Sequence, residues 1–411
     1  MEEIKEIEEQ VILAAVSAGS EEDTQQSLDE LEELTRTAGA AVVGRLLQNR
    51  EAPHPGTYIG KGKIEELKAL ILLTDATGII CDDELSPAQM NNLERELSCK
   101  VMDRTLLILD IFAAHASTSE GKIQVELAQL RYRASRLVGL RASLSRLGGG
   151  IGTRGPGEKK LEMDRRLIRD RISALKEELS QVEKHREVLR AGRQRGNLKT
   201  AAIVGYTNAG KSTLLNTLTG AGVLSEDKLF ATLDPTTRLL TLPDAQQILL
   251  TDTVGFIRKL PHHLVEAFKS TLEEAKYADY IIHVVDSSSE TADMQMHVVY
   301  ETLRELGALN HTVITLFNKQ DLAPETSIRD LRSDYSLKIS AKTGEGLDAL
   351  LELLQKLLAE GLIYVERVLP YTAGGILQQI REQGQLLSEE YTGEGIAVKA
   401  RVPMQLYGRL I

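Results

Sequence analysis

Residues 205–213, GYTNAGKST, have the spacing of a loop that binds nucleotide phosphates. Gly205 is followed, after four residues, by Gly210, Lys211 and Ser212. Between a strand and a helix, such a loop directs backbone N–H groups toward a β-phosphate. The Lys211 ammonium would reach the β- and γ-phosphates, and the Ser212 hydroxyl would ligate Mg²⁺. The loop comprises Gly205, Tyr206, Thr207, Asn208, Ala209, Gly210, Lys211, Ser212 and Thr213.

Three further motifs follow in chain order: DTVG at 252–255, NKQD at 318–321 and SAK at 340–342. The Asp252 carboxylate would hold Mg²⁺ through water, and the Gly255 N–H would meet the γ-phosphate. The Asp321 carboxylate can accept hydrogen bonds from guanine N1–H and the 2-amino group, and we expect it to be buried, which would exclude adenine. The motif residues are Asp252, Thr253, Val254, Gly255, Asn318, Lys319, Gln320, Asp321, Ser340, Ala341 and Lys342. The four motifs together predict a GTP site.

A second protein ligand for Mg²⁺ is expected from the loop that senses the γ-phosphate. We favour Thr232, which lies about 20 residues after Ser212, a usual separation in GTPases. Thr236 and Thr237 are the alternatives.

The position after DTVG, where a Ras-like enzyme has a water-orienting Gln, holds Phe256. We therefore expect slow intrinsic hydrolysis and name Lys211, Asn208 and Gly255 as catalytic candidates. Asn208 would coordinate K⁺ beside the phosphates; alternatively, it serves loop geometry only. The other candidate source of the group that positions the attacking water is a partner that orders residues 255–270. This segment carries Arg258, Lys259, His262 and His263.

The elements that position these motifs alternate between strands and helices. Before residue 116, strands are expected at 10–17, 40–48 and 78–83, with helices at 27–39, 63–76 and 86–99; residues 100–116 close this region. Ser86 and Pro87 form a helix-start signal. A second α/β region, with strands at 199–205, 247–255, 279–286 and 311–321, surrounds the motifs, and a β-α-β-β region follows residue 360.

Between the two α/β regions, apolar residues recur in alternating steps of three and four. The repeat Leu161, Ile168, Leu175, Val182 and Leu189 is typical of a coiled-coil seam. It faces an earlier apolar series from Ile123 to Leu144, and the segment GGGIGTRGPGEKK separates the two. We predict an antiparallel helical hairpin with a Gly-rich, basic tip that carries Arg146, Arg154, Lys159 and Lys160. Arg131, Arg133, Arg136 and Arg141 would add positive charge along its stem.

Composition restricts the class of protein. No run of about 18 apolar residues exists, so no membrane span is expected. Cys81 and Cys99 are the only cysteines, which favours a reducing compartment, the cytoplasm. The net charge is −11, yet residues 131–199 hold 19 Lys and Arg against 8 Asp and Glu. A local basic projection on an acidic protein suits RNA.

These segments resemble the HflX-type GTPases. The resemblance rests on GTYIGKGKIEEL, RLGGGIGTRGPGEKK, GYTNAGKSTLLNTLT, LFATLDPTTR and LTDTVGFIRKL, and it covers nearly the whole chain. It implies an N-terminal α/β domain (1–115), a helical hairpin (116–195), a Ras-like P-loop domain (196–360) and a small α+β C-terminal domain (361–411). It implies nucleotide contacts throughout the 205–213 loop and the three later motifs, and also at Phe230, Ala231, Thr232, Leu233 and Asp234. It implies Mg²⁺ on Ser212 and Thr232.

The resemblance also implies cytoplasmic GTP hydrolysis, binding to the large ribosomal subunit and separation of 70S ribosomes into subunits. Two alternatives stay open: a GTPase in large-subunit assembly or RNA modification, and a regulatory switch whose hairpin binds a protein. Because the hairpin closes on itself, we expect a monomer. Residues 59–63, IGKGK, are a weak candidate for a second nucleotide site.

Overall fold

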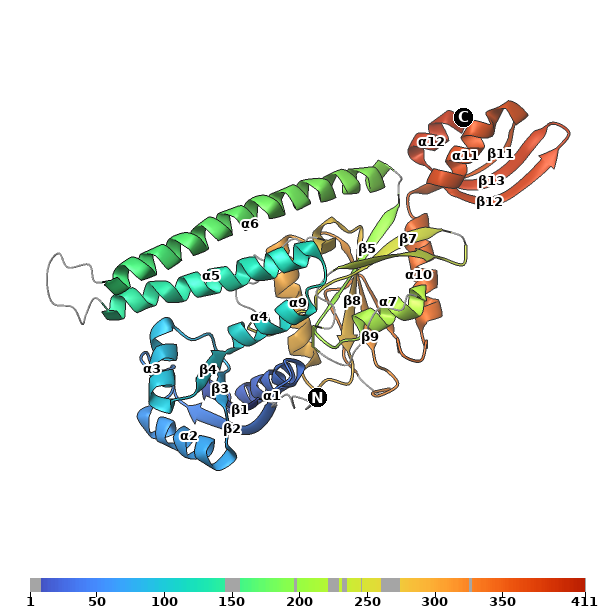
Figure 1. Ribbon diagram of the computed structural model, residues 1–411. Coiled ribbons are helices and arrows are strands. Elements are labelled where there is room, and N and C mark those ends of the chain that lie inside the picture. The colour runs from blue at the N-terminus through green and yellow to red at the C-terminus, as the bar shows by residue number, and fades with distance from the viewer. Residues whose placement is uncertain are drawn as a thin grey trace, which may run out of the picture. The chain divides into compact units, whose positions relative to one another are not determined.

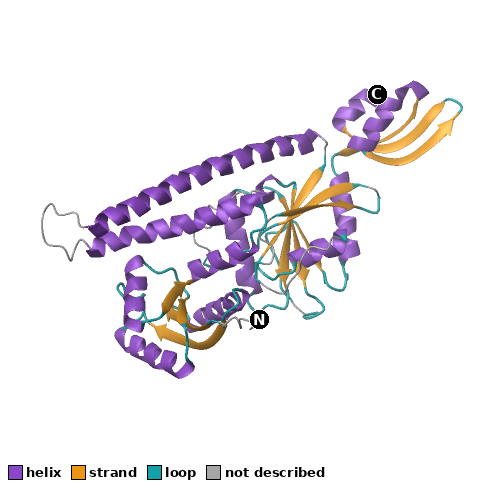
Figure 2. Ribbon diagram, viewed as in Figure 1, coloured by secondary structure: helices purple, strands orange, loops and turns teal. Residues whose placement is uncertain are grey.

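The computed structural model describes residues 9–144, 156–195, 198–220, 229–230, 235–244, 246–259, 274–324 and 327–410 (Figure 1). They form two compact units. The first contains residues 9–144, 156–182, 229–230 and 257–259, and the second contains the other described residues. Figure 2 shows the sheets and helices of each unit. No helix in the described part of the chain has both the length and the apolar character that crossing a membrane requires.

The first unit begins with a four-stranded parallel sheet in the order β2-β1-β3-β4. Its central strands β1 and β3 read as continuous apolar runs, as expected for parallel strands that are buried on both faces. Along β1, for example, every residue after Gln10 is buried. The elements are β1 (Gln10–Ser17), α1 (Glu21–Thr37), β2 (Ala41–Asn49), α2 (Lys61–Thr74), β3 (Gly78–Cys81), α3 (Pro87–Leu97), β4 (Lys100–Asp103) and α4 (Arg104–His115).

The predicted helix-start signal at Ser86 is confirmed. The Ser86 hydroxyl accepts a hydrogen bond from the Gln89 backbone N–H, while the Gln89 side chain accepts one from the Ser86 N–H. With Pro87 in the first turn, this capping box satisfies backbone donors that a helix otherwise leaves without partners.

Two long helices, α5 (Ser119–Leu144) and α6 (Pro156–Arg195), form the predicted hairpin. The Arg171 guanidinium donates two hydrogen bonds to the Glu126 carboxylate, at 2.7 and 2.8 Å. Arg165, nearer the start of α6, bonds the backbone oxygen of Leu137, nearer the end of α5. The two helices therefore run antiparallel. Leu175 is fully buried, and the other described seam residues of α6 (Ile168, Ile172, Leu179 and Val182) are half-buried.

The second unit contains a six-stranded sheet in the order β10-β9-β8-β5-β7-β6, parallel except that β6 is antiparallel to β7. Parallel strands aligned in this way bring the predicted nucleotide motifs to one edge of the sheet, where β5, β7 and β9 end. The elements are β5 (Lys199–Gly205), α7 (Lys211–Thr219), β6 (Thr236–Thr241), β7 (Gln247–Asp252), β8 (Tyr280–Asp286), α9 (Ala292–Leu306), β9 (Thr312–Asn318), β10 (Tyr335–Lys338) and α10 (Leu347–Ala359).

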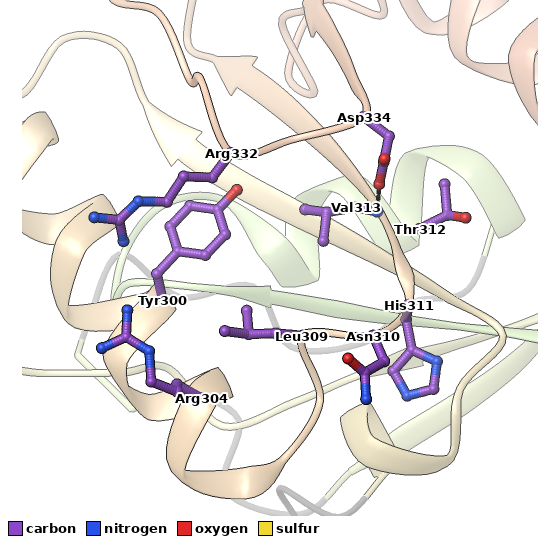
Figure 3. A pocket seen from close by; sticks show the side chains of 9 residues that line it. All are labelled: Tyr300, Arg304, Leu309, Asn310, His311, Thr312, Val313, Arg332 and Asp334. Carbon is purple, nitrogen blue, oxygen red and sulfur yellow. Dashed lines mark hydrogen bonds between the residues drawn. The ribbon is translucent and has the colours of Figure 1, made fainter.

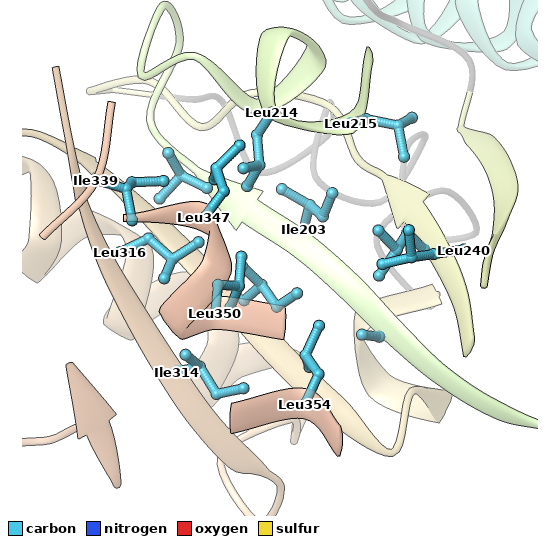
Figure 4. Packing of buried hydrophobic residues seen from close by; sticks show 14 of the residues in the cluster. Ile203, Leu214, Leu215, Leu240, Ile314, Leu316, Ile339, Leu347, Leu350 and Leu354 are labelled. Atoms are coloured by element: carbon cyan, nitrogen blue, oxygen red, sulfur yellow. The ribbon is translucent and has the colours of Figure 1, made fainter. Parts of the chain in front are cut away.

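Alternate residues of each central strand face opposite layers. Ile314 and Leu316 of β9 pack with Leu214 of α7 and Leu350 of α10 (Figure 4). Phe317 packs instead with Met296 of α9 and Val285 of β8. Helices α7 and α10 therefore cover one face of the sheet and α9 covers the other.

The C-terminal region has an antiparallel sheet in the order β11-β13-β12. Its core joins strand residues such as Val398 to Leu377 of α11 and Leu406 of α12. The elements are β11 (Leu362–Leu369), the short 3₁₀ helix η1 (Tyr371–Ala373), α11 (Gly374–Gln383), β12 (Gln385–Thr392), β13 (Gly395–Pro403) and α12 (Met404–Leu410). The expected β-α-β-β order is confirmed, and α12 is an addition that the sequence did not predict.

The predicted fold class is confirmed: parallel α/β regions, a helical hairpin and a small α+β C-terminal region. Strand β6 and helix α9 were not predicted. Strand β6 lies at a sheet edge, and of its six residues only Leu240 is buried, so it lacks the apolar run of a central strand.

Candidate nucleotide-binding site

The phosphate loop joins the end of β5 to the start of α7. Asn208 and Gly210 have φ values of 58° and 96°, a left-handed conformation that Gly and Asn adopt at least cost. A Cβ on Gly210 would lie 2.3 Å from Asn318 Nδ2, so only glycine allows the loop to pass this close to β9. The loop amides therefore converge at the N-terminus of α7, where the helix dipole favours an anion.

Lys211 is held at the base of this loop. Its side chain is buried, and Nζ donates a hydrogen bond to the Tyr206 backbone oxygen at 2.7 Å. Burial lowers the pKa of Lys211 to about 8, against the opposing effect of the nearby Asp252 carboxylate. An ammonium that is poorly solvated in this way gains strongly from an approaching phosphate.

Two oxygen groups beside the loop fit the predicted Mg²⁺ site. The Ser212 hydroxyl donates a hydrogen bond of 2.7 Å to Oδ2 of Asp252, which is fully buried at the end of β7. A hydroxyl and a carboxylate are hard oxygen donors of the kind that Mg²⁺ prefers. In addition, the buried Thr207 Oγ1 has no hydrogen-bond partner among the described residues, which suits a ligand oxygen.

The segment Asp252–Gly255 lies directly against the phosphate loop. Thr253 Oγ1 donates to the Ile203 backbone oxygen at 2.8 Å. Thr207 N–H donates to Phe256 O at 2.9 Å, and Phe256 N–H donates to Gly205 O at 3.1 Å. A Cβ on Gly255 would lie 2.8 Å from Thr207 Cγ2 and 3.1 Å from Lys211 Nζ. The Phe256 side chain is buried.

Asn318 connects NKQD and SAK, the two motifs predicted to bind the base, to the phosphate loop. Its Nδ2 donates to the Ala209 backbone oxygen at 2.9 Å, and its Oδ1 accepts from the Ala341 N–H at 2.8 Å. Neighbouring contacts support this arrangement, because the Thr217 hydroxyl donates to Ala341 O at 2.8 Å. NKQD and SAK are therefore locked to the phosphate loop.

Asp321 differs from its prediction in one respect. Its Oδ1 accepts a hydrogen bond from the Ser340 hydroxyl at 2.7 Å, which joins NKQD to SAK as expected. The residue is exposed, however, so the expectation of a buried Asp321 is wrong. If Asp321 contacts the base, adenine would be rejected because it covers the carboxylate without offering it an N–H donor.

Two supporting residues, Asp286 and Ser287, were not predicted from the sequence. The Lys319 ammonium lies 2.7 Å from Oδ2 of Asp286, and Gln320 Nε2 donates to Ser287 Oγ at 2.9 Å. Asp286 ends β8 and Ser287 follows it, so both lie at the same sheet edge as the motifs. Polar residues at the end of an apolar strand were the signal that could have identified them.

Comparison with known proteins finds matches along most of the chain. Three family models match: the GTP-binding GTPase N-terminal region over residues 25–113, the GTP-binding GTPase middle region over 115–193, and the 50S ribosome-binding GTPase over 200–319. The GTPase HflX of Lacrimispora saccharolytica is 68% identical over 409 residues, which cover 99% of this chain and 97% of the relative. The GTPase HflX of Escherichia coli is 41% identical over 408 residues, which cover 98% of this chain and 95% of the relative.

The chain belongs to the HflX family of GTPases. The predicted family and the predicted enzyme class, a GTPase, are thereby confirmed. Among solved structures, a GTP-binding protein from the archaeon Sulfolobus solfataricus in complex with GDP is 26% identical. It covers 86% of this chain and 99% of its own, with a TM-score of 0.45.

Some predicted site residues lie elsewhere or outside the described residues. Phe230 belongs to the first unit, where its ring packs edge to face on Phe112 with centroids 4.6 Å apart. Thr236 and Thr237, the alternative Mg²⁺ ligands, are in strand β6, where Thr237 Oγ1 lies 3.0 Å from Thr251 Oγ1. Outside the described residues are Ala231, Thr232, Leu233, Asp234, His262, His263, Arg146 and Arg154.

The positively charged residues after DTVG and along the hairpin stem are partly neutralised. Lys259, in the first unit, lies 2.7 Å from Asp83 Oδ1 and also pairs with Asp82. Arg136, predicted to add positive charge along the stem, is instead paired with the buried Asp103 and stacked on the Tyr132 ring at 3.7 Å. The prediction for Arg136 is therefore wrong, because its charge is compensated within the fold.

Proposed function

We propose that this chain binds the large ribosomal subunit in its GTP form and promotes separation of 70S ribosomes into subunits. The observation that carries the proposal is the match of residues 200–319, which contain the nucleotide motifs, to the family model described as a 50S ribosome-binding GTPase. GTP hydrolysis then releases the protein, because the loops that contact the γ-phosphate lose that contact. We further propose that it acts as a monomer in the cytoplasm.

In the proposed hydrolysis, each residue has a role that follows from its position. The loop amides of Gly205 to Thr213 cradle the phosphates, and Lys211 balances charge on the β- and γ-phosphates. Ser212, Asp252 and Thr232 would hold Mg²⁺, which supplies positive charge to the phosphate oxygens. The Gly255 N–H contacts the γ-phosphate, and Asp321 selects guanine.

The basic tip of the hairpin is proposed as the part that contacts ribosomal RNA. The Gly-rich sequence 148–157 contains Arg154, and Lys159 and Lys160 follow it near the start of α6. Cationic side chains on a Gly-rich segment suit irregular, phosphate-rich RNA.

Binding to purified 50S subunits over a range of salt concentrations tests this proposal. With a non-hydrolysable GTP analogue, affinity should fall steeply as salt rises. Replacing Arg154, Lys159 and Lys160 together with Ala should reduce the slope of log K against log salt by about 2, since each lost phosphate contact contributes about 0.7–0.9. Equal affinity in the GTP and GDP forms, or an unchanged salt slope, would contradict the proposal.

A further inference from the structure

A second pocket lies at the opposite edge of the six-stranded sheet from the nucleotide motifs. It has a volume of about 470 Å³ and is formed by the end of α9, the loop into β9 and the segment before β10 (Figure 3). Thr312, which lines the pocket at the amino end of β9, is six residues before Asn318, a distance of about 20 Å along the strand. A ligand here would not compete with the nucleotide.

The floor and one wall of this pocket are held rigidly by a single carboxylate. Asp330 Oδ2 accepts hydrogen bonds from Tyr300 Oη and Thr315 Oγ1, both at 2.6 Å. Its Oδ1 accepts from the Arg332 backbone N–H at 2.9 Å. The same carboxylate thus fixes the Tyr300 ring and the start of the segment that carries Arg332. A site built in this way loses little conformational entropy when a ligand binds.

Two arginines give the pocket its charge. The Arg332 guanidinium lies 5.2 Å from the centroid of the Tyr300 ring, and no carboxylate among the described residues pairs with it. Arg304 also lines the pocket (Figure 3), but its Nη1 already donates to both Glu301 carboxylate oxygens at 2.8 Å. Asp334 also lines the pocket, but its carboxylate accepts from the Val313 N–H at 2.8 Å. Arg332 is therefore the group best able to bind a new anion.

The apolar part of the lining is next to this cation. Val313 and the Tyr300 ring are buried beneath the pocket, and Leu309 is 38% exposed at its side. A ligand that contacts both the Arg332 guanidinium and the apolar lining must carry an anionic group next to an apolar side chain. The guanidinium favours a planar carboxylate, which it can bind through two parallel hydrogen bonds.

We propose that this pocket, defined by Tyr300, Arg304, Leu309, Val313, Arg332 and Asp334, binds an acidic peptide segment of a protein partner. One carboxylate of the peptide pairs with Arg332, and a neighbouring apolar side chain packs on Leu309 and Val313. RNA fits less well, because the buried Tyr300 offers no face for stacking a base. The net charge of −11 acts only weakly here, since salt screens charges beyond about 8 Å.

Selection from a random heptapeptide library displayed on phage, with the full-length GDP-bound chain as target, tests the proposal directly. The Arg332→Glu variant serves as the counter-target. Enriched peptides should contain Asp or Glu next to an apolar residue. A synthetic, fluorescein-labelled copy of the consensus should bind at least tenfold more weakly to Arg332→Glu, as measured by fluorescence anisotropy.

Arg329→Glu is the matched control, because Arg329 is exposed, lies three residues away and does not line the pocket. It should change the affinity less than twofold. Should Arg332→Glu bind GDP abnormally or melt early, Arg332→Gln replaces it in the same comparison. The proposal fails if no peptide is enriched, if the consensus lacks a carboxylate, or if Arg329→Glu weakens binding equally. It also fails if labelled hexauridylate, and not the peptides, binds in an Arg332-dependent way.

Discussion

Adding one carbon atom at Gly255 tests how closely the DTVG segment must approach the phosphate loop. In Gly255→Ala, the new Cβ would lie 2.8 Å from Thr207 Cγ2 and 2.9 Å from Thr207 Cα. Carbon atoms normally approach to about 3.5–4.0 Å, so residue 255 must retreat by about 0.6–1 Å. The Thr207 backbone cannot yield easily, because its N–H is bonded to Phe256 O at 2.9 Å.

The retreat would move the residue 255 N–H away from the γ-phosphate that we propose it contacts. A displacement of about 1 Å costs on the order of 100-fold in rate, equivalent to about 2.7 kcal/mol. Single-turnover hydrolysis of radiolabelled GTP should therefore slow by about 100-fold. GDP affinity, measured by calorimetry, should change less than threefold, because GDP has no γ-phosphate.

The matched control is Gly375→Ala in α11, where a Cβ meets no atom within 4 Å. This variant should hydrolyse GTP at the parental rate. The reasoning is refuted if Gly255→Ala also hydrolyses GTP within threefold of the parent.

Three other substitutions have defined outcomes. Asp321→Asn should weaken GTP binding by at least about 100-fold and favour xanthosine triphosphate, whose O2 can accept from a carboxamide N–H; competition binding measures this, and unchanged preference for GTP would contradict it. Asn208→Gly keeps the left-handed backbone at φ 58° but removes the carboxamide. The parent should hydrolyse GTP faster in KCl than in matched NaCl, and the variant should lose this difference. Equal parental rates in the two salts would exclude a K⁺ site. Leu175→Ala, at a fully buried seam position, should destabilise the hairpin by about 2–5 kcal/mol. Its control, Leu167→Ala, changes a side chain that is 62% exposed and should cost under about 0.5 kcal/mol. Thermal melting monitored by circular dichroism compares the two variants.

That the motif residues of the candidate site lie together was predictable, because each motif is defined by a short stretch of sequence. A strand, a Gly-rich turn and a helix suffice to define the phosphate loop, and the parallel sheet then brings Asp252, Asn318 and Ser340 to the same edge. The coiled-coil seam was predictable for the same reason, because Leu175 and its neighbours follow a short period.

Features that depend on distant partners were not predictable. The pairing of Arg136 with Asp103 joins residues 33 apart, and no local pattern indicates it. The exposure of Asp321 depends on which residues surround the NKQD loop. Strand β6 gains its hydrogen bonds from β7 and has little apolar pattern of its own.

The central claim, that the GTP form separates ribosomes, is tested most directly by sedimentation of purified 70S ribosomes with this protein. Parallel gradients would contain GTP, a non-hydrolysable GTP analogue or GDP. We predict that the analogue and GTP shift 70S particles toward free subunits, with the protein in the 50S fraction, and that GDP does not. Intact 70S peaks in all three gradients, in the presence of protein that binds GTP normally, would contradict the account.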